Sequence, residues 1–183
     1  MENNYPRVTS IIKSVFPMDL THIPDSVLQP AIDFGNAVHK MVELYIKGTL
    51  NMGTLDDTLN PYLEQFKKWL KDSKIQILGS EKQLTSEKYK FKGSPDIWGK
   101  IKGRLSIVDI KTTMTIAKTI GLQLSGYEIL VKEHLGTNIV NCDRYVLRLS
   151  PDKYEFLPFK RKSDMSAFLA CMFLNNYRKE VGL

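Results

Sequence analysis

The period of the apolar residues changes near residue 75, and this change constrains the fold more than any other feature of the sequence. Before it, apolar residues recur every three or four positions, which predicts helices at residues 31–47 and 60–71. After it, apolar and polar residues alternate, which predicts successive strands at residues 75–85, 88–93, 96–102 and 104–111. A run of strands beside amphipathic helices indicates an α/β fold.

The second half of the chain returns to helical spacing and then alternates again. We expect a helix at residues 116–135, strands at 138–150 and 153–159, and a last helix at 164–179. Lys102-Gly103 indicates a tight hairpin turn. Residues 1–30 are expected to be irregular because prolines punctuate them, apart from a short helix ending near Val15. The elements together predict a mixed sheet flanked by helices, in a single domain of 183 residues.

Composition excludes some classes of protein and site. No apolar run approaches the ~20 residues of a membrane span, and the N-terminus lacks a secretory pattern, so we expect a cytoplasmic protein and no membrane partner. Cys142 and Cys171 are too few for a four-cysteine cluster, and we expect them to be buried free thiols. The net charge of +6 suits a polyanionic partner but is weak evidence alone.

A carboxylate and an amine end the predicted strand at residues 104–111. Asp109 and Lys111 lie two residues apart and therefore project from the same face. The hairpin brings Asp96 of the preceding strand back beside Asp109. Two carboxylates about 4–5 Å apart repel each other by roughly 3–4 kcal/mol at an effective dielectric of about 20, so they need a proton or a cation. We expect Mg²⁺ or Mn²⁺, with the carbonyl of Ile110 as a further oxygen donor and Lys111 orienting water or stabilising developing charge.

These residues resemble a known family. The segment from Pro95-Asp96 to Asp109-Ile110-Lys111 resembles the signature of the PD-(D/E)xK nuclease superfamily. Three further matches make the chain similar to the RecB-type exonuclease branch without an iron–sulfur cluster, which includes small phage and mitochondrial genome-maintenance exonucleases. They are a G-x-x-x-H motif that runs from Gly35 to His39 on the predicted helix, the D-x-K-T sequence that begins at Asp109, and a Q-x-x-x-Y motif formed by Gln123 and Tyr127.

The resemblance implies a restriction-endonuclease-like fold and a metal-dependent DNA exonuclease. It implies that His39 is a metal ligand beside Asp96 and Asp109, and that Gln123 and Tyr127 contact the substrate. The substrate would be single strands or DNA ends, in recombination, repair or phage DNA processing. A structure-specific endonuclease and a non-catalytic nucleic-acid-binding module are the alternatives. A helicase or another DNA-processing partner is also considered, and the oligomeric state is left open.

Several side chains have a second interpretation. His39 is either a ligand or a hydrogen-bonded core histidine, and Asp96 and Asp109 are either ligands or part of a strand-end ion pair with Lys111. Glu43, one turn after His39, either orients His39 or a metal-bound water or is solvated. Glu81 either faces the site or forms a cross-strand ion pair. The remaining open positions are Tyr127 and Trp98, for which core packing competes with substrate contact, and the basic residues Lys100, Lys102, Arg104 and Lys118, for which solvation competes with a DNA path.

Overall fold

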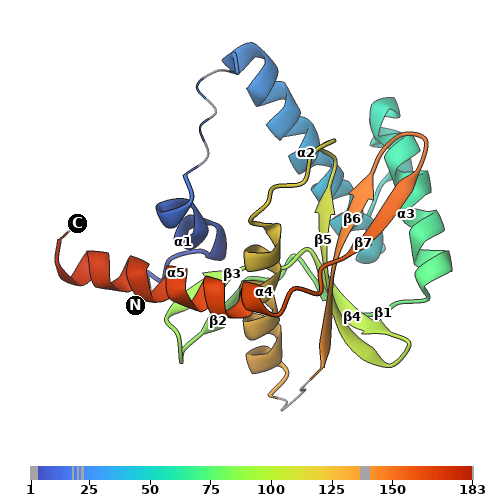
Figure 1. Ribbon diagram of the computed structural model, residues 1–183. Helices are drawn as coiled ribbons and strands as arrows, with labels where there is room; N and C mark the ends of the chain where they lie inside the picture. Colours follow the sequence, from blue (N-terminus) through green and yellow to red (C-terminus); the bar gives the residue numbers. More distant parts are fainter. Residues whose placement is uncertain (1–3, 18, 20, 22, 137–140, 183) are drawn as a thin grey trace.

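A five-stranded sheet forms the centre of the computed structural model, which describes residues 4–17, 19, 21, 23–136 and 141–182 (Figure 1). The strand order is β1-β4-β5-β6-β7. β5 and β6 are parallel and the other neighbouring pairs are antiparallel, so the sheet is mixed as predicted. The bounds are β1 Gln76–Ser80, β4 Ile97–Ile101, β5 Arg104–Lys111, β6 Cys142–Leu149 and β7 Tyr154–Pro158.

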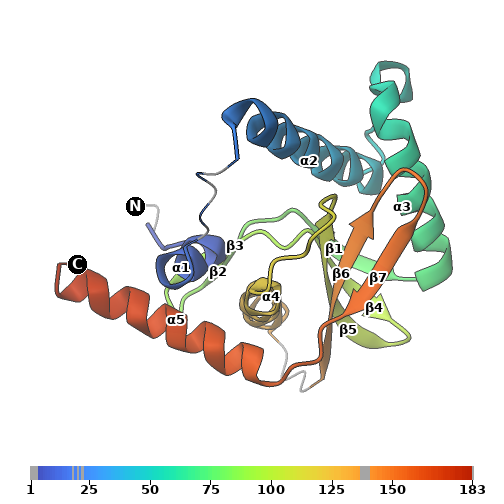
Figure 2. The ribbon, with the colours of Figure 1, turned by 45° about the horizontal axis from the view of Figure 1, so that its top comes forward.

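Helices cover both faces of this sheet, which confirms the predicted α/β fold with a mixed sheet flanked by helices (Figure 2). On one face lie the helices α1 (Val8–Val15), α4 (Ile120–His134) and α5 (Ser163–Glu180), with a second sheet of β2 (Leu84–Ser86) and β3 (Phe91–Gly93). On the other face lie α2 (Asp25–Ile46) and α3 (Asn60–Ser73). Two 3₁₀ turns, η1 (Met52–Thr54) and η2 (Asp57–Leu59), connect α2 to α3.

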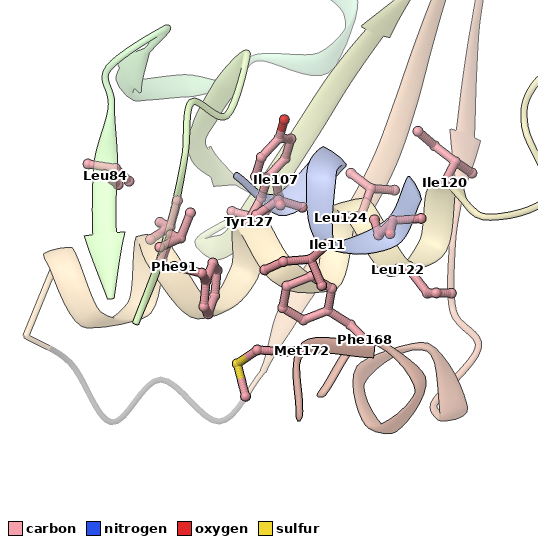
Figure 3. Packing of buried hydrophobic residues seen from close by; sticks show 14 of the residues in the cluster. Ile11, Leu84, Phe91, Ile107, Ile120, Leu122, Leu124, Tyr127, Phe168 and Met172 are labelled. Atoms are coloured by element: carbon pink, nitrogen blue, oxygen red, sulfur yellow. The ribbon is translucent and has the colours of Figure 1, made fainter. Parts of the chain in front are cut away.

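The alternation of side chains along β5 divides the core in two. Leu105 and Ile107 point toward α4, where they join α1 and α5 in one apolar cluster (Figure 3). Val108 and Ile110 point the other way and pack with α2 and α3. Because successive strand residues face opposite sides, Asp109 projects on the α4 side. The apolar pattern that builds the core therefore also fixes the side on which this carboxylate lies.

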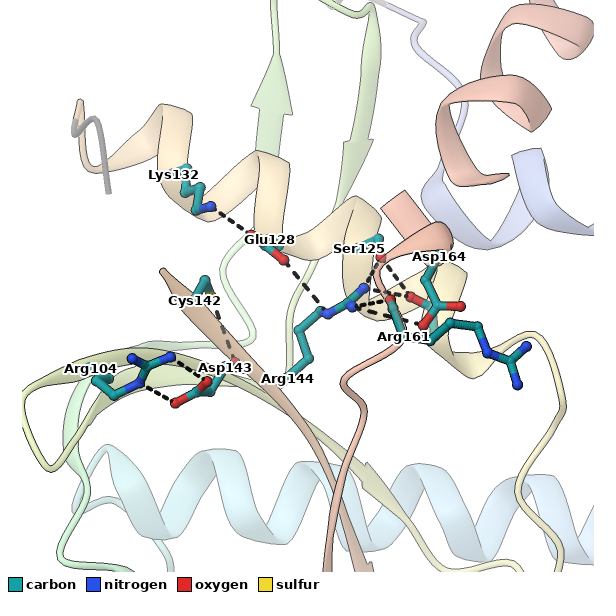
Figure 4. A network of polar contacts seen from close by, with 10 residues as sticks. Arg104, Ser125, Glu128, Lys132, Cys142, Asp143, Arg144, Arg161 and Asp164 are labelled. Atoms are coloured by element: carbon teal, nitrogen blue, oxygen red, sulfur yellow. Dashed lines mark hydrogen bonds and ion pairs between the residues drawn. The ribbon is translucent and has the colours of Figure 1, made fainter. Parts of the chain in front are cut away.

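A buried arginine ties α4, β6 and α5 together on the α4 side (Figure 4). The guanidinium of Arg144 is 8% exposed and lies 3.7 Å from Glu128 and 3.8 Å from Asp164. It also donates to the hydroxyl of Ser125 and to the carbonyl oxygen of Arg161. A buried guanidinium with two carboxylates and these acceptors is paired and hydrogen-bonded, as burial of a charge requires.

The predicted strand at residues 75–85 is wrong as a single element. The chain leaves the five-stranded sheet after β1 and enters the two-stranded sheet at β2. Between them Glu81 has a φ of 48°, in the left-handed region, and a strand cannot continue through that conformation. Ser80, Glu81, Lys82 and Gln83 are four consecutive polar residues, and the single strand predicted across them did not take account of this interruption.

Helix α2 begins at Asp25, six residues before the predicted start, although it contains Pro30. The missing N–H of Pro30 leaves the carbonyl of Ser26 without its helical partner, and Ser26 is exposed to water. Conversely, α4 begins at Ile120, four residues later than predicted. The strand predicted at 138–150 begins at Cys142, and residues 138–140 lie outside the described part of the chain.

The tight turn predicted at Lys102-Gly103 is confirmed, and the burial predicted for the two cysteines is confirmed for Cys171 alone. The β4–β5 hairpin turns at Lys102 and Gly103, which have φ values of 50° and 78°. Cys142 and Cys171 are free thiols; Cys171 is buried and Cys142 is half-buried. None of the helices in the described ranges combines the length and the apolar character that crossing a membrane requires.

Candidate active site

The β4–β5 hairpin brings two carboxylates together at one end of the sheet. Ile97 pairs with Val108, so the next position in this register sets Asp96 beside Asp109. Asp96 Oδ2 accepts a hydrogen bond of 2.6 Å from the backbone N–H of Ile110. The side chain of Asp96 is 9% exposed and that of Asp109 is fully buried. A register set by a two-residue turn thus holds both groups at neighbouring positions.

Lys111 and α4 hold the carboxylate of Asp109. Lys111 Nζ lies 2.7 Å from Asp109 Oδ2, and Gln123 Nε2 donates to Asp109 Oδ1 at 2.7 Å. Gln123 also donates to the hydroxyl of Tyr127 at 3.3 Å. Both groups predicted on α4 therefore lie at the site, and the ring of Tyr127 is at the same time part of the apolar core.

Helix α2 adds an imidazole from the other side of the sheet. His39 Nδ1 lies 3.4 Å from Asp96 Oδ1 and 3.4 Å from Glu81 Oε1. One potential ligand atom from each of these three residues lies within 4.8 Å of the other two. They border a pocket of about 300 Å³ that is also lined by Asn36, Lys40 and Glu43. His39, Glu81 and Asp96 thus form one cluster, called the acidic–imidazole cluster below.

Glu81 reaches this cluster because of its backbone. Its N–H donates to the carbonyl oxygens of Pro95 and Asp96 at 3.0 and 3.2 Å, and its φ is 48°. A non-glycine residue in this conformation costs free energy, so the surrounding structure must hold it there. The cross-strand alternative for Glu81 stayed open at the level of sequence because neither residue type nor spacing signals a left-handed glutamate.

Charge interactions across the site outweigh burial for three of its groups. Burial opposes charging of the imidazole, but the charge of Asp96 and hydrogen bonds to Asp96 and Glu81 raise the pKa of His39 to about 10. Burial likewise opposes ionisation of Asp96, but the positive charges of His39 and Lys111 keep its pKa below the ordinary value. The pKa of Lys111 is raised despite burial because Asp109 and Asp96 lie beside it.

Burial outweighs the neighbouring positive charges for two carboxyl groups, and their pKa values are raised. Burial, together with the negative charge of Asp96, raises the pKa of Asp109. Burial also raises the pKa of Glu81, and the charge of Asp96 adds to this effect. Three acidic groups gathered with one lysine leave an excess of negative charge when the histidine is neutral, and a divalent cation would compensate it.

The donor set fits a divalent metal ion. Carboxylate oxygens suit Mg²⁺ and Mn²⁺, and the neutral imidazole of His39 would add one nitrogen donor. Opposite ligands of an octahedral ion lie about 4.2 Å apart at bond lengths near 2.1 Å. The separations in the acidic–imidazole cluster are therefore close to those that one ion requires, and small side-chain movements would close the difference.

Three other residues considered for the site, Glu43, Trp98 and Arg104, are engaged in pairing or packing. Glu43 lines the pocket, but its carboxylate is paired with Lys40 and Lys47, and its pKa is lowered by hydrogen bonds from both. Trp98 is 1% exposed and packs in the core, as its predicted packing role requires. Arg104 forms a two-pronged pair with Asp143 near the start of β5, at the opposite end of that strand from Lys111.

Comparison with known proteins relates the chain to solved structures only; at the level of sequence, no protein-family model and no curated protein matches it. A candidate exonuclease from Eubacterium rectale superimposes with a TM-score of 0.55 and 13% identity. The match covers 79% of this chain and 65% of that one, so this chain spans less than two thirds of that protein. At such identity the similarity shows a shared fold.

Two further matches have lower TM-scores. LHK-Exo in complex with dAMP aligns at 0.33 with 13% identity, over 97% of this chain and 93% of that one. An alkaline exonuclease, LHK-Exo from Laribacter hongkongensis, aligns at 0.30 with 16% identity, over 78% and 83% of the two chains.

Proposed function

We propose that this chain is a metal-dependent deoxyribonuclease of the PD-(D/E)xK class, acting as an exonuclease on single strands or DNA ends. The observation that carries the proposal is the convergence of His39, Glu81 and Asp96 beside the buried Asp109–Lys111 pair. These groups come from α2, the β1–β2 connection and the β4–β5 hairpin. An ion pair that served only to stabilise a strand end would need neither the imidazole nor the strained Glu81.

Each side chain has a role in this proposal. His39, Asp96 and Glu81 hold the metal, and Asp109 and the carbonyl of Ile110 are further oxygen donors. In the free protein, Lys111 engages Oδ2 of Asp109 and Gln123 engages Oδ1. One of these two partners must therefore release its oxygen before Asp109 can bind the metal ion. Gln123 positions the carboxylate, and Tyr127 orients Gln123 through its hydroxyl. A bound divalent cation would polarise the scissile phosphate and lower the pKa of a water molecule.

The proposed role of Lys111 is to supply a fixed positive charge beside Asp109. Its side chain is 27% exposed, so the ammonium pairs with Asp109 and can still reach a substrate. Its raised pKa means that it stays charged over the whole range in which DNA is hydrolysed enzymatically. A fixed positive charge at this place can orient the attacking water or stabilise the charge that develops on the phosphate oxygens.

Replacing either member of the buried pair tests the proposal. Asp109→Asn and Lys111→Ala should each abolish Mn²⁺-dependent hydrolysis of an end-labelled oligonucleotide, by about a hundredfold or more. Asp152→Asn and Lys68→Ala are matched controls, since both side chains are exposed, and they should cleave like the wild type. Circular dichroism shows whether each variant is folded. Full metal-dependent activity in both folded site variants would refute the assignment.

A further inference from the structure

Two apolar side chains are exposed on the elements that carry or follow His39 and Lys111. Met114 is 89% exposed, the largest value among the exposed large hydrophobic residues in the described ranges, and Ile32 is 45% exposed. Met114 follows Lys111 by three positions, in the loop between β5 and α4. Ile32 precedes His39 by seven positions on α2, so the two share a helix face and lie about 10 Å apart along the axis. Neither side chain contributes to a core.

The loop that carries Met114 has a fixed backbone. The guanidinium of Arg148 donates to the carbonyl oxygen of Met114, and Arg148 is itself paired with Glu155 on β7. Arg148 is the partner of Lys111 in the β5–β6 register, so this contact ties the loop to the strand that ends in the site. The hydroxyl of Thr113 donates to the carbonyl oxygen of Thr115 at 3.0 Å. The backbone is therefore held while the methionine side chain points into solvent.

The same loop lies against α2. A β-carbon at Gly35 would lie 3.6 Å from Thr112 Oγ1, so the first residue of the loop lies beside this turn of the helix. Figures 1 and 2 both draw this loop beside α2. Gly35 lies between Ile32 and His39 on the helix. Ile32 and Met114 thus extend from two neighbouring elements, one of which carries His39 while the other follows Lys111.

We propose that Ile32 and Met114 contact the faces of unpaired nucleobases in the strand whose phosphate enters the site. This inference rests on the proposed function and names its substrate class. Apolar side chains gain nothing from phosphate oxygens but gain from the flat, weakly hydrated faces of bases. In a duplex those faces are covered by stacking, whereas in a single strand they are accessible. The pair would therefore favour single strands over duplex DNA.

Ile32→Ser and Met114→Ser test the pair, and Met52→Ser is the control because Met52 is 52% exposed on η1, away from this loop. The substrates are a single-stranded oligonucleotide and the same oligonucleotide with abasic residues next to the cleaved end. Each site variant should raise KM for the normal strand by about three- to tenfold, while kcat changes little. For the wild type, the abasic strand should raise KM by a similar factor. Each single variant should show a smaller abasic penalty, and the double variant Ile32→Ser/Met114→Ser should show none.

Equal KM values for wild type and both variants, or the same abasic penalty in the variants as in the wild type, would overturn the inference. Fluorescence anisotropy of the two oligonucleotides without added metal separates it from the proposed function. If no DNA is hydrolysed but the double variant Ile32→Ser/Met114→Ser still removes the preference for bases over abasic residues, the nuclease proposal fails and the base contact stands. If binding is indifferent to bases while hydrolysis proceeds, the base contact fails alone.

Discussion

At the residue scale, His39 links the charge state of the site to the metal that it would bind. Its pKa is raised to about 10, so below pH 9 the imidazole carries a proton between Asp96 and Glu81. A histidine binds a metal ion as the neutral imidazole, and binding must therefore release that proton. We expect the Mn²⁺ affinity to rise by about tenfold per pH unit between pH 7 and 9, since one proton leaves for each ion bound.

Calorimetric titration with Mn²⁺ in buffers of different ionisation enthalpy measures this release directly. The wild type should release close to one proton at pH 8, and His39→Gln should bind more weakly and release less. An affinity that is the same at pH 7 and pH 9 would show that the imidazole does not take part. The direction is fixed by the raised pKa: a group that holds its proton more firmly in the free protein opposes the cation more strongly as the pH falls.

Most residues of the candidate site could be predicted from the sequence because the proposed chemistry depends on short spacings. Asp109 and Lys111 follow from strand periodicity, and the hairpin turn brings Asp96 beside them. His39 required the family resemblance, since one histidine on a helix has no distinctive pattern of its own. The sequence could not decide whether Glu81 faces the site. Its position depends on a left-handed backbone and on two hydrogen bonds from its N–H to the β3–β4 connection. Backbone strain at a single residue cannot be recognised from the residue type.

At the scale of elements, the close approach of β1 to β4 depends on Gly79. It pairs with Trp98, and a β-carbon at Gly79 would lie 2.1 Å from the indole ring, which is 1% exposed and has no room to move. We expect Gly79→Ala to lower the free energy of unfolding by about 1–3 kcal/mol, the usual cost of overpacking a core. Denaturant unfolding measures it.

Gly53→Ala is the matched control, because a β-carbon there would meet only Asn51 Oδ1 at 3.4 Å on an exposed turn. It should change stability by no more than about 0.5 kcal/mol. Equal unfolding midpoints for the two variants would show that β1 can shift without cost. The spacing of apolar residues along the sequence indicates which face of a strand is buried, but it does not show how closely the backbones of β1 and β4 approach at Gly79.

At the scale of the whole molecule, the fold was predictable and the topology was not. The change of period near residue 75 gives the mixed sheet and the helices that flank it, because burial of an apolar stripe on each helix leaves few other arrangements. Strand order depends on long-range pairing, such as the parallel register of β5 with β6 across α4. No short segment of sequence encodes such a pairing, and the separate two-stranded sheet was missed for the same reason.

The arrangement of the molecule also bears on how a strand reaches the site. Asp109 is fully buried and the pocket beside Asp96 has a volume of about 300 Å³, which suits one nucleotide rather than a duplex. A strand with a free end enters such a pocket more easily than the middle of a closed strand, which must bend sharply. We therefore expect linear single-stranded DNA to be degraded at least about tenfold faster than a covalently closed single-stranded circle of the same sequence. Gel analysis with Mn²⁺ measures both rates, and Lys111→Ala reports the background. Cutting of intact circles as fast as linear strands would make the enzyme an endonuclease, with the same metal-binding residues serving a more open path for DNA.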